Sequence, residues 1–188
     1  MRKKHVARML DSADYFNIPL TKEDLEEYLD QISSRVHTPQ RTRVLLDQHG
    51  NLDSESISFA LLENNQPLKV SLAREPIDSS NIFLFHKTTR RDVYESAQRG
   101  FEDLDDVLLY NENGELTEFT IGNLVVELEG QFFTPPVACG VLAGTFRAYL
   151  LETGQIVERV ISVQQLSSYT KIFRVNSLRR WQIAELIV

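Results

Sequence analysis

The stretch LTEFTIGNLVVELEGQFFTPPVACGVLAGTFRAYLLE, residues 116–152, decides the fold because it changes from strand-like to helix-like patterning within one segment. The runs NLVVELE and QFFTP are typical of two antiparallel strands that meet across Gly130. The run GTFRAYLLETG predicts a helix that begins near Thr145 and is closed by Gly154. Together with the elements on either side, this succession indicates an α+β fold.

The C-terminal part of the chain extends in both directions from this stretch. Ahead of it, IFLF (82–85) predicts a strand and residues 88–99 a helix, with Lys87 between them. A lysine at the end of a buried strand loses hydration unless it is paired or neutral, so Lys87 is a candidate functional residue. The other elements expected here are strands at 105–110, 115–119, 156–162 and 171–177 and a short helix near 163–168.

The N-terminal part is expected to hold two amphipathic helices and three strands. The first helix covers residues 3–16, and Thr21 followed by Asp24 predicts a capping box at the start of the second. The polar, proline-containing run EPIDSSN (75–81) indicates a linker. The strand-like runs are 41–47, 56–63 and 68–74. The predicted division is a small α+β domain (1–76), a linker (77–81) and a large domain (82–188).

The core predicted for this small domain is thin. The chain opens directly on an amphipathic helix, and three strands with two helices bury little apolar surface. We therefore expect that an N-terminal piece of the small domain is missing or is supplied by another chain.

The composition of the 188-residue chain argues against several classes of protein. Hydrophobic residues make up 42% and charged residues 25%, as in soluble globular proteins. The net charge of −7 lacks the basic footprint of a nucleic-acid binder, and no apolar run reaches the roughly 20 residues that span a bilayer. Cys139 is the only cysteine, which excludes an intrachain disulfide and a cysteine cluster for zinc. We expect a cytoplasmic protein without a metal site.

Three segments carry a resemblance to a known family, namely FLFHKTTRRDVYESA (83–97), the stretch 116–152 and FRVNSLRRW (173–181). They resemble the class IV aminotransferases, the fold-type IV pyridoxal-phosphate enzymes, which include the D-amino acid aminotransferases. HKTTRRDVYE with VNSLRRW is most similar to the aminodeoxychorismate lyase modules joined to para-aminobenzoate synthase. The resemblance implies pyridoxal 5'-phosphate as the cofactor and a two-part α+β fold with the cofactor in the cleft between the parts.

The resemblance assigns two residues to the reactive ring of the cofactor. Lys87 falls where the family carries the lysine that bonds covalently to pyridoxal phosphate, and the same amine can serve as general base. Glu118 matches the family carboxylate that pairs with the pyridine nitrogen and keeps it protonated. Taken alone, each residue also fits an ordinary solvated side chain.

Four further residues match positions that hold the cofactor phosphate. Thr145 and Phe146 lie at the predicted helix start, where N–H groups and the helix dipole attract anions. Ser177 matches a second phosphate-contacting hydroxyl, and Arg8 matches an arginine whose guanidinium suits phosphate geometry. A solvated arginine on the first helix is the alternative for Arg8.

For the substrate, Arg90 and Arg91 are candidates to attract the carboxylates of a chorismate-like molecule, or are solvated residues at a helix start. The implied reaction converts 4-amino-4-deoxychorismate to 4-aminobenzoate and pyruvate, in folate biosynthesis. The alternatives are a branched-chain or D-amino acid aminotransferase and a truncated relative without catalytic activity. The resemblance also implies a homodimer and fusion to, or cooperation with, aminodeoxychorismate synthase.

Overall fold

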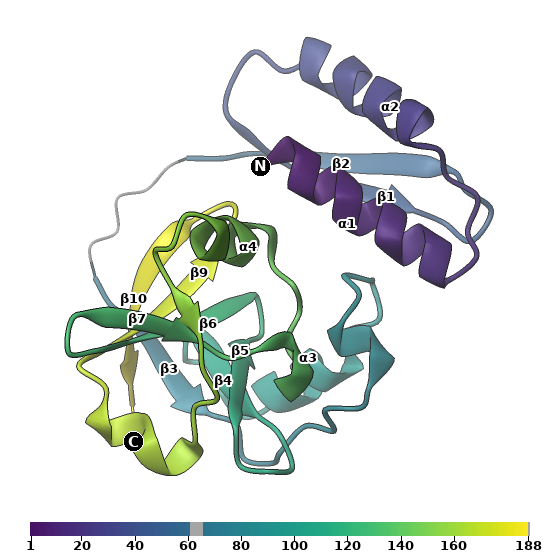
Figure 1. Cartoon of the computed structure of the whole chain (residues 1–188). Coiled ribbons are helices and arrows are strands. Elements are labelled where there is room, and N and C mark those ends of the chain that lie inside the picture. The colour runs from purple at the N-terminus through teal and green to yellow at the C-terminus, as the bar shows by residue number, and fades with distance from the viewer. Residues whose placement is uncertain (61–65, 188) are drawn as a thin grey trace. The chain divides into compact units, whose positions relative to one another are not determined.

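The computed structural model describes residues 1–60 and 66–187, and it divides the chain into two compact units, Met1–Asn64 and Asn65–Val188 (Figure 1). The elements of the N-terminal unit are α1 (Arg2–Tyr15), α2 (Lys22–Ser34), β1 (Gln40–Leu46) and β2 (Leu52–Ser58). None of the helices in the described residues has both the length and the apolar character needed to cross a lipid bilayer.

The N-terminal unit packs two helices with an antiparallel hairpin of β1 and β2. Thr21 caps α2 as the sequence predicts, because its Oγ1 accepts a 3.1 Å hydrogen bond from the Asp24 N–H. Within residues 1–60, the buried apolar side chains are those of Val6, Ala13 and Leu25. The small core of this unit is therefore supplied by the helices rather than by the hairpin.

The C-terminal unit is built around one sheet. Its strands are β3 (Leu68–Leu72), β4 (Asp106–Tyr110), β5 (Leu116–Phe119), β6 (Gly122–Leu128), β7 (Gln131–Thr134), β8 (Val157–Glu158), β9 (Lys171–Asn176) and β10 (Arg180–Leu186). Its helices are α3 (Asp92–Gln98) and α4 (Thr145–Glu152), with 3₁₀ turns η1 (Ile82–Leu84), η2 (Val137–Cys139) and η3 (Val163–Ser168).

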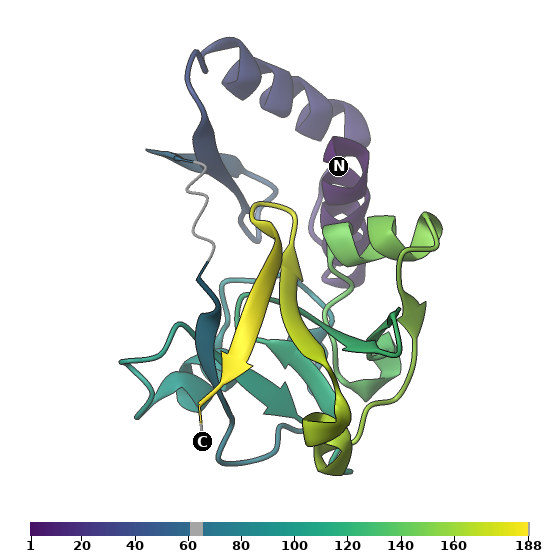
Figure 2. The same ribbon diagram turned by 90° about the vertical axis from the view of Figure 1, so that its left-hand side faces the viewer.

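The sheet closes on itself. Within residues 66–187, eight strands pair in the order β5-β4-β3-β10-β9-β6-β7-β8. The first strand of this order, β5, also pairs with β6, so the strands from β5 through β6 in this order close into a barrel. Strands β9 and β10 form the long yellow hairpin of Figure 2, and α4 packs against β9. This mixed barrel with helices around it is the α+β fold that the sequence predicts.

Strand β4 is buried on both faces because successive side chains of a strand point to opposite sides. Leu108 joins an apolar cluster with Phe119 and Leu124. Val107 and Leu109 join a second cluster that contains Tyr94 of α3. The helix α3 thus covers one face of the barrel next to β4 and β5.

The strand predicted at 68–74 belongs to the larger unit, not to the small domain. β3 pairs in parallel with both β4 and β10, which makes it an inner strand of the barrel. Ile77 of the predicted linker is buried and bridges to Asn111. The two compact units therefore divide at Asn64 and Asn65 rather than within 77–81, because the pairing of β3 draws the following segment into the barrel.

Several predicted elements differ in type or extent. The run IFLF forms the turn η1 instead of a strand, because the Asn81 side chain accepts a hydrogen bond from the Phe83 N–H and favours a local turn. The helix predicted at 88–99 is confined to α3, and β10 was not predicted. The strand predicted at 156–162 is reduced to β8. Strand β2 begins before the predicted run 56–63 and overlaps only its first residues, and the last residues of that run lie outside the described residues.

Candidate active site

Glu118 is a buried carboxylate on β5, only 3% exposed. The Tyr94 hydroxyl donates to its Oε1 at 2.8 Å, and the Leu142 N–H donates to the same oxygen at 3.3 Å. The Asn123 amide donates to Oε2 at 3.0 Å. Because an ionised carboxylate offers about four acceptor positions, one position remains on Oε2 for a further donor.

The surroundings of Glu118 act on its ionisation in opposite directions. Burial raises the pKa of the carboxyl to about 7, because the charged form loses hydration. The hydrogen bonds from Tyr94 and from the Leu142 N–H lower that pKa, as do the positive charges of Lys87 and Arg91. A further cation at Oε2 would stabilise the ionised carboxylate.

Lys87 lies in the loop between η1 and α3, and it is exposed. The expectation that it ends a buried strand is therefore wrong, because a 3₁₀ turn precedes it and leaves it at the surface. Its ammonium nevertheless acts electrostatically on the carboxyl of Glu118. The two residues that the sequence assigns to the reactive ring are thus close enough for the charge of one to act on the other.

Asn123 ties the loop before α4 to Glu118. The same Nδ2 that donates to Glu118 also donates to the Leu142 carbonyl, at 2.9 Å. Gly144, which precedes α4, permits this close approach, since a Cβ on it would lie 1.9 Å from the Asn123 Oδ1. The first turn of α4 is therefore held at a fixed place beside the buried carboxylate.

Thr145 and Phe146 open α4, and both are buried. The N–H groups of a first helical turn have no acceptor inside the helix, which suits them to an anion. The Arg180 guanidinium lies over the Phe146 ring, 4.9 Å from its centroid. Ser177 lies half-buried in the turn between β9 and β10, close in sequence to Arg180. The start of α4 is thereby connected to the hairpin that carries Ser177.

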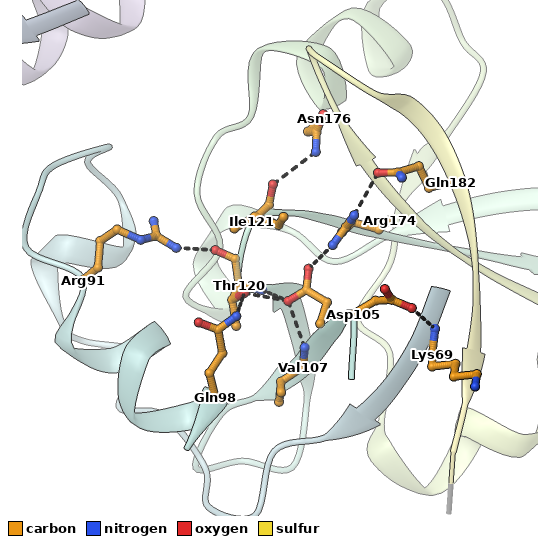
Figure 3. A network of polar contacts seen from close by, with 11 residues as sticks. Lys69, Arg91, Gln98, Asp105, Val107, Thr120, Ile121, Arg174, Asn176 and Gln182 are labelled. Atoms are coloured by element: carbon orange, nitrogen blue, oxygen red, sulfur yellow. Dashed lines mark hydrogen bonds and ion pairs between the residues drawn. The ribbon is translucent and has the colours of Figure 1, made fainter. Parts of the chain in front are cut away.

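Asn176 connects that hairpin to the turn that follows β5. Its Oδ1 accepts hydrogen bonds from the Leu178 and Arg179 N–H groups, at 3.1 and 2.8 Å. Its amide donates to the Ile121 carbonyl at 3.2 Å (Figure 3). Glu118, the start of α4 and the turn with Ser177 therefore form one connected region of the C-terminal unit.

The two candidate substrate arginines have different surroundings. Arg91 donates to the Thr120 carbonyl at 2.5 Å, and its guanidinium lies 4.4 Å from the centroid of the Tyr94 ring. Arg90 is exposed, where it pairs with Asp92 at 3.1 Å and lies over the Phe83 ring. Arg91 is thus engaged within the protein, whereas Arg90 faces solvent beside the loop of Lys87.

A second buried carboxylate, Asp106 on β4, holds the turn after β5. Its Oδ1 accepts from the Val107 N–H at 2.8 Å and from the N–H and hydroxyl of Thr120 at 3.0 and 2.6 Å. Its Oδ2 pairs with the Arg174 guanidinium at 2.6 Å. Gln98 of α3 adds a 3.1 Å bond to the Thr120 hydroxyl. This network fixes the backbone immediately after Glu118.

Sequence reasoning missed the roles of Tyr94, Asp106 and Arg174. Tyr94 is buried on α3, and its hydroxyl finds a partner on a strand that is distant in sequence. Asp106 and Arg174 stand as charged residues inside the apolar runs DVLLY and KIFRVN. A charged residue in such a run is the signal that could have indicated a buried polar network.

Arg8 lies on α1 in the N-terminal unit, half-buried. Its assignment to the cofactor phosphate stays a prediction, as do the roles of the other site residues.

The closed barrel, with Lys87 and the buried Glu118 in one site, has the features of a fold-type IV pyridoxal-phosphate enzyme. The chain belongs to the amino-transferase class IV family, whose model matches residues 2–187. Class IV aminotransferases use pyridoxal phosphate as their cofactor.

Among curated proteins, the chain is 32% identical to a Schizosaccharomyces pombe protein named "Putative aminodeoxychorismate lyase", over 74% of this chain and 64% of that protein. It is 27% identical to a Thermotoga maritima "Probable branched-chain-amino-acid aminotransferase", over 90% of this chain and 66% of that protein. The chain thus spans slightly less than two thirds of the length of these relatives.

Among solved structures, a "Putative amino-acid aminotransferase" from Mesorhizobium loti matches with a TM-score of 0.90 and 33% identity, over 98% of this chain and 91% of that one. A hypothetical aminotransferase from Mycobacterium tuberculosis, solved with alpha-ketoglutarate and PMP, matches with a TM-score of 0.79 over 98% of this chain and 75% of that one. At 15% identity, this second match shows a shared fold.

Proposed function

We propose that this chain is a pyridoxal-phosphate-dependent lyase that converts 4-amino-4-deoxychorismate to 4-aminobenzoate and pyruvate. The observation that carries the proposal is the buried Glu118 carboxylate, which keeps one acceptor position and on which the charge of Lys87 acts. The choice of reaction is supported by the 32% identity to a relative named for it.

The residues of the site fit pyridoxal phosphate. Glu118 keeps one acceptor position. Its burial destabilises the ionised carboxylate, which a positive charge would stabilise. A protonated pyridine nitrogen offers both a donor and a charge. Lys87 would hold the aldehyde carbon, and the residues proposed for the phosphate are Arg8, Thr145, Phe146 and Ser177.

When bound, the cofactor supplies a sink for the electrons that remain after a proton leaves the substrate. Glu118 sustains that sink by staying ionised next to the ring nitrogen. Lys87 would act as the general base, taking at its Nζ the proton from the substrate carbon that bears the amine. Its exposed position on a loop leaves it room to change partners.

The reaction balances without an oxidant or a reductant. The ring carbon that bears the amine loses its hydrogen as a proton to Lys87, and the bond between the neighbouring ring carbon and the ether oxygen breaks. The ring becomes aromatic, and the released enolpyruvate takes up a proton to become pyruvate. Arg90 is the arginine that we propose for a substrate carboxylate, since its pair with Asp92 is exposed, whereas Arg91 binds the Thr120 carbonyl.

A second candidate function is amino-acid transamination by the same lysine. It is favoured by the 33% identity to the Mesorhizobium loti protein, which is matched over 91% of its length. The two reactions differ in their products, since transamination converts an amino acid and a 2-oxo acid into a new pair and releases no aromatic amine.

The test begins with absorbance spectra of the purified protein with pyridoxal phosphate, beside a Lys87→Ala variant. We expect a yellow band in the wild type that borohydride removes by fixing the cofactor to the chain, and no such fixation in the variant. Mass spectrometry of a peptide with the cofactor on Lys87 gives the direct identification. A wild type that never retains the cofactor would contradict the proposal.

The reaction is then assigned with two substrates given separately. Formation of 4-aminobenzoate from 4-amino-4-deoxychorismate supports the lyase. Conversion of an amino acid with 2-oxoglutarate, without activity on the first substrate, supports the aminotransferase. We also propose a homodimer that works with an aminodeoxychorismate synthase, which light scattering and co-purification test.

A further inference from the structure

Tyr94 belongs to α3, a helix that supplies none of the residues proposed to hold the cofactor. The residue is 6% exposed, and it packs in the apolar cluster with Leu84 and Val107. Burial and the neighbouring Glu118 raise the pKa of its hydroxyl, so this group keeps its proton and acts as a donor. It donates to the Glu118 Oε1 at 2.8 Å.

Arg91 also holds the Tyr94 ring in place, in addition to the apolar cluster. The Arg91 guanidinium lies 4.4 Å from the ring centroid and donates to the Thr120 carbonyl, two residues after Glu118. The phenol and the carboxylate are thus fixed to the same turn. A ring held in this way can direct its hydroxyl to one oxygen of Glu118.

The two oxygens of Glu118 are occupied unequally. Oε1 accepts from both Tyr94 and the Leu142 N–H, which fills its two acceptor positions. Oε2 accepts from the Asn123 amide, which leaves one position. The oxygen that can bind another donor is therefore set by the protein.

We propose that Tyr94 is a positioning residue of the cofactor site, which holds Oε1 of Glu118 so that Oε2 remains as the acceptor for the pyridine nitrogen. This inference rests on the proposed function, because it requires that pyridoxal phosphate binds. The charged and titratable groups that face Glu118 are Lys87, Arg91 and Tyr94 itself. Tyr94 differs from the other two because it also donates directly to the carboxylate.

The experiment measures the dissociation constant of pyridoxal phosphate across pH for the wild type and for Tyr94→Phe. Phenylalanine keeps the ring, its packing and its contact with Arg91, and removes only the hydroxyl. We expect the affinity to fall by about tenfold to a hundredfold near neutral pH, the effect of one hydrogen bond to a charged group.

The pH dependence separates positioning from a general structural role. Without the hydroxyl, Glu118 ionises at higher pH than in the wild type, because a donor that stabilises the carboxylate is gone. We therefore expect the ratio of the two dissociation constants to fall as the pH rises above neutral, down to the factor that the lost orientation of Oε2 sets by itself. A structural defect would instead weaken binding by the same factor at every pH.

Tyr110→Phe is the matched control, because the Tyr110 hydroxyl bonds the Arg74 carbonyl at 3.4 Å and not Glu118. We expect this variant to bind the cofactor like the wild type.

Equal affinities of wild type and Tyr94→Phe, or a ratio that is constant with pH, would overturn the inference. If the wild type itself fails to retain the cofactor through Lys87, the proposed function fails and the inference fails with it. If only the Tyr94 result is negative, the proposed function stands.

Discussion

Asp106 and Glu118 are buried carboxylates on the paired strands β4 and β5, yet their partners differ in kind. Asp106 accepts four hydrogen bonds, one of them from the cation Arg174. Glu118 accepts three among the described residues, and none of those donors is charged. A carboxylate accepts about four hydrogen bonds, so Asp106 has its full number with a cation among the donors, whereas Glu118 has one fewer and no charged donor.

The difference separates a structural network from a binding site. A buried charge with a full set of partners fixes the fold around it, as Asp106 fixes the turn at Thr120. A buried carboxylate without its own cation is costly unless a ligand supplies one. Asp106 is therefore a structural residue, whereas Glu118 is the residue that we propose to pair with the cofactor.

The largest effect is expected when the fully occupied carboxylate loses its cation. Arg174→Ala leaves Asp106 buried and unpaired, which should cost about 3–5 kcal/mol of the free energy of unfolding. Chemical denaturation measures this loss. Lys171→Ala on the same strand breaks an exposed pair with Glu127, and we expect a cost below about 1 kcal/mol. Equal losses in the two variants would contradict the contrast.

Glu118, the carboxylate with fewer partners, should make the free energy of unfolding depend on pH. The pKa of Glu118 is about 7 in the folded protein and 4.5 as its ordinary value, so between these values the folded state holds more protons than the unfolded state. Stability contributed by this group therefore falls as pH rises through this window, by about 3 kcal/mol, and levels off above it.

Denaturation of the cofactor-free protein across this window measures the effect. Glu118→Gln cannot titrate, so the free energy of unfolding of this variant should not show the fall between pH 4.5 and about 7. This holds even if the substitution changes the overall stability. The difference between the two curves removes the contribution of all other groups. Parallel curves would show that Glu118 does not carry the raised pKa.

A smaller effect is expected from the close approach of Gly144 to Asn123. Gly144→Ala places a Cβ against the Asn123 Oδ1 and should cost about 1–3 kcal/mol, since one of the two has to shift. In the background of Asn123→Ala the obstructing atom is absent, so the same change should cost much less. A double-mutant cycle measures this coupling, and additive costs would contradict it.

Much of the C-terminal unit could be predicted from the sequence because its signals are local. Gly130 marks the β6–β7 turn, and the helix start at Thr145 follows from its own flanking residues. The prediction of a strand at IFLF was wrong because an apolar run does not reveal the capping bond of Asn81. β10 was not predicted, although it pairs with both β3 and β9.

The residues of the candidate site likewise fall into those that the sequence indicates and those that only the fold reveals. Lys87 and Glu118 could be proposed because short motifs around them resemble a family, whereas the hydroxyl of Tyr94 gains its role only when α3 packs against β5. Likewise, the amide of Asn123 acts on two segments that the sequence separates. Contacts between distant segments have no local signature, so their roles require the fold.

The most direct measurement is the ¹³C chemical shift of the Glu118 side-chain carboxyl, followed across pH with and without pyridoxal phosphate and assigned with Glu118→Gln. We expect titration near pH 7 in the cofactor-free protein. With the cofactor bound, the carboxyl should stay ionised to clearly lower pH, because a cation then occupies Oε2. A titration that is identical in both states would show that Glu118 is not the partner of the cofactor.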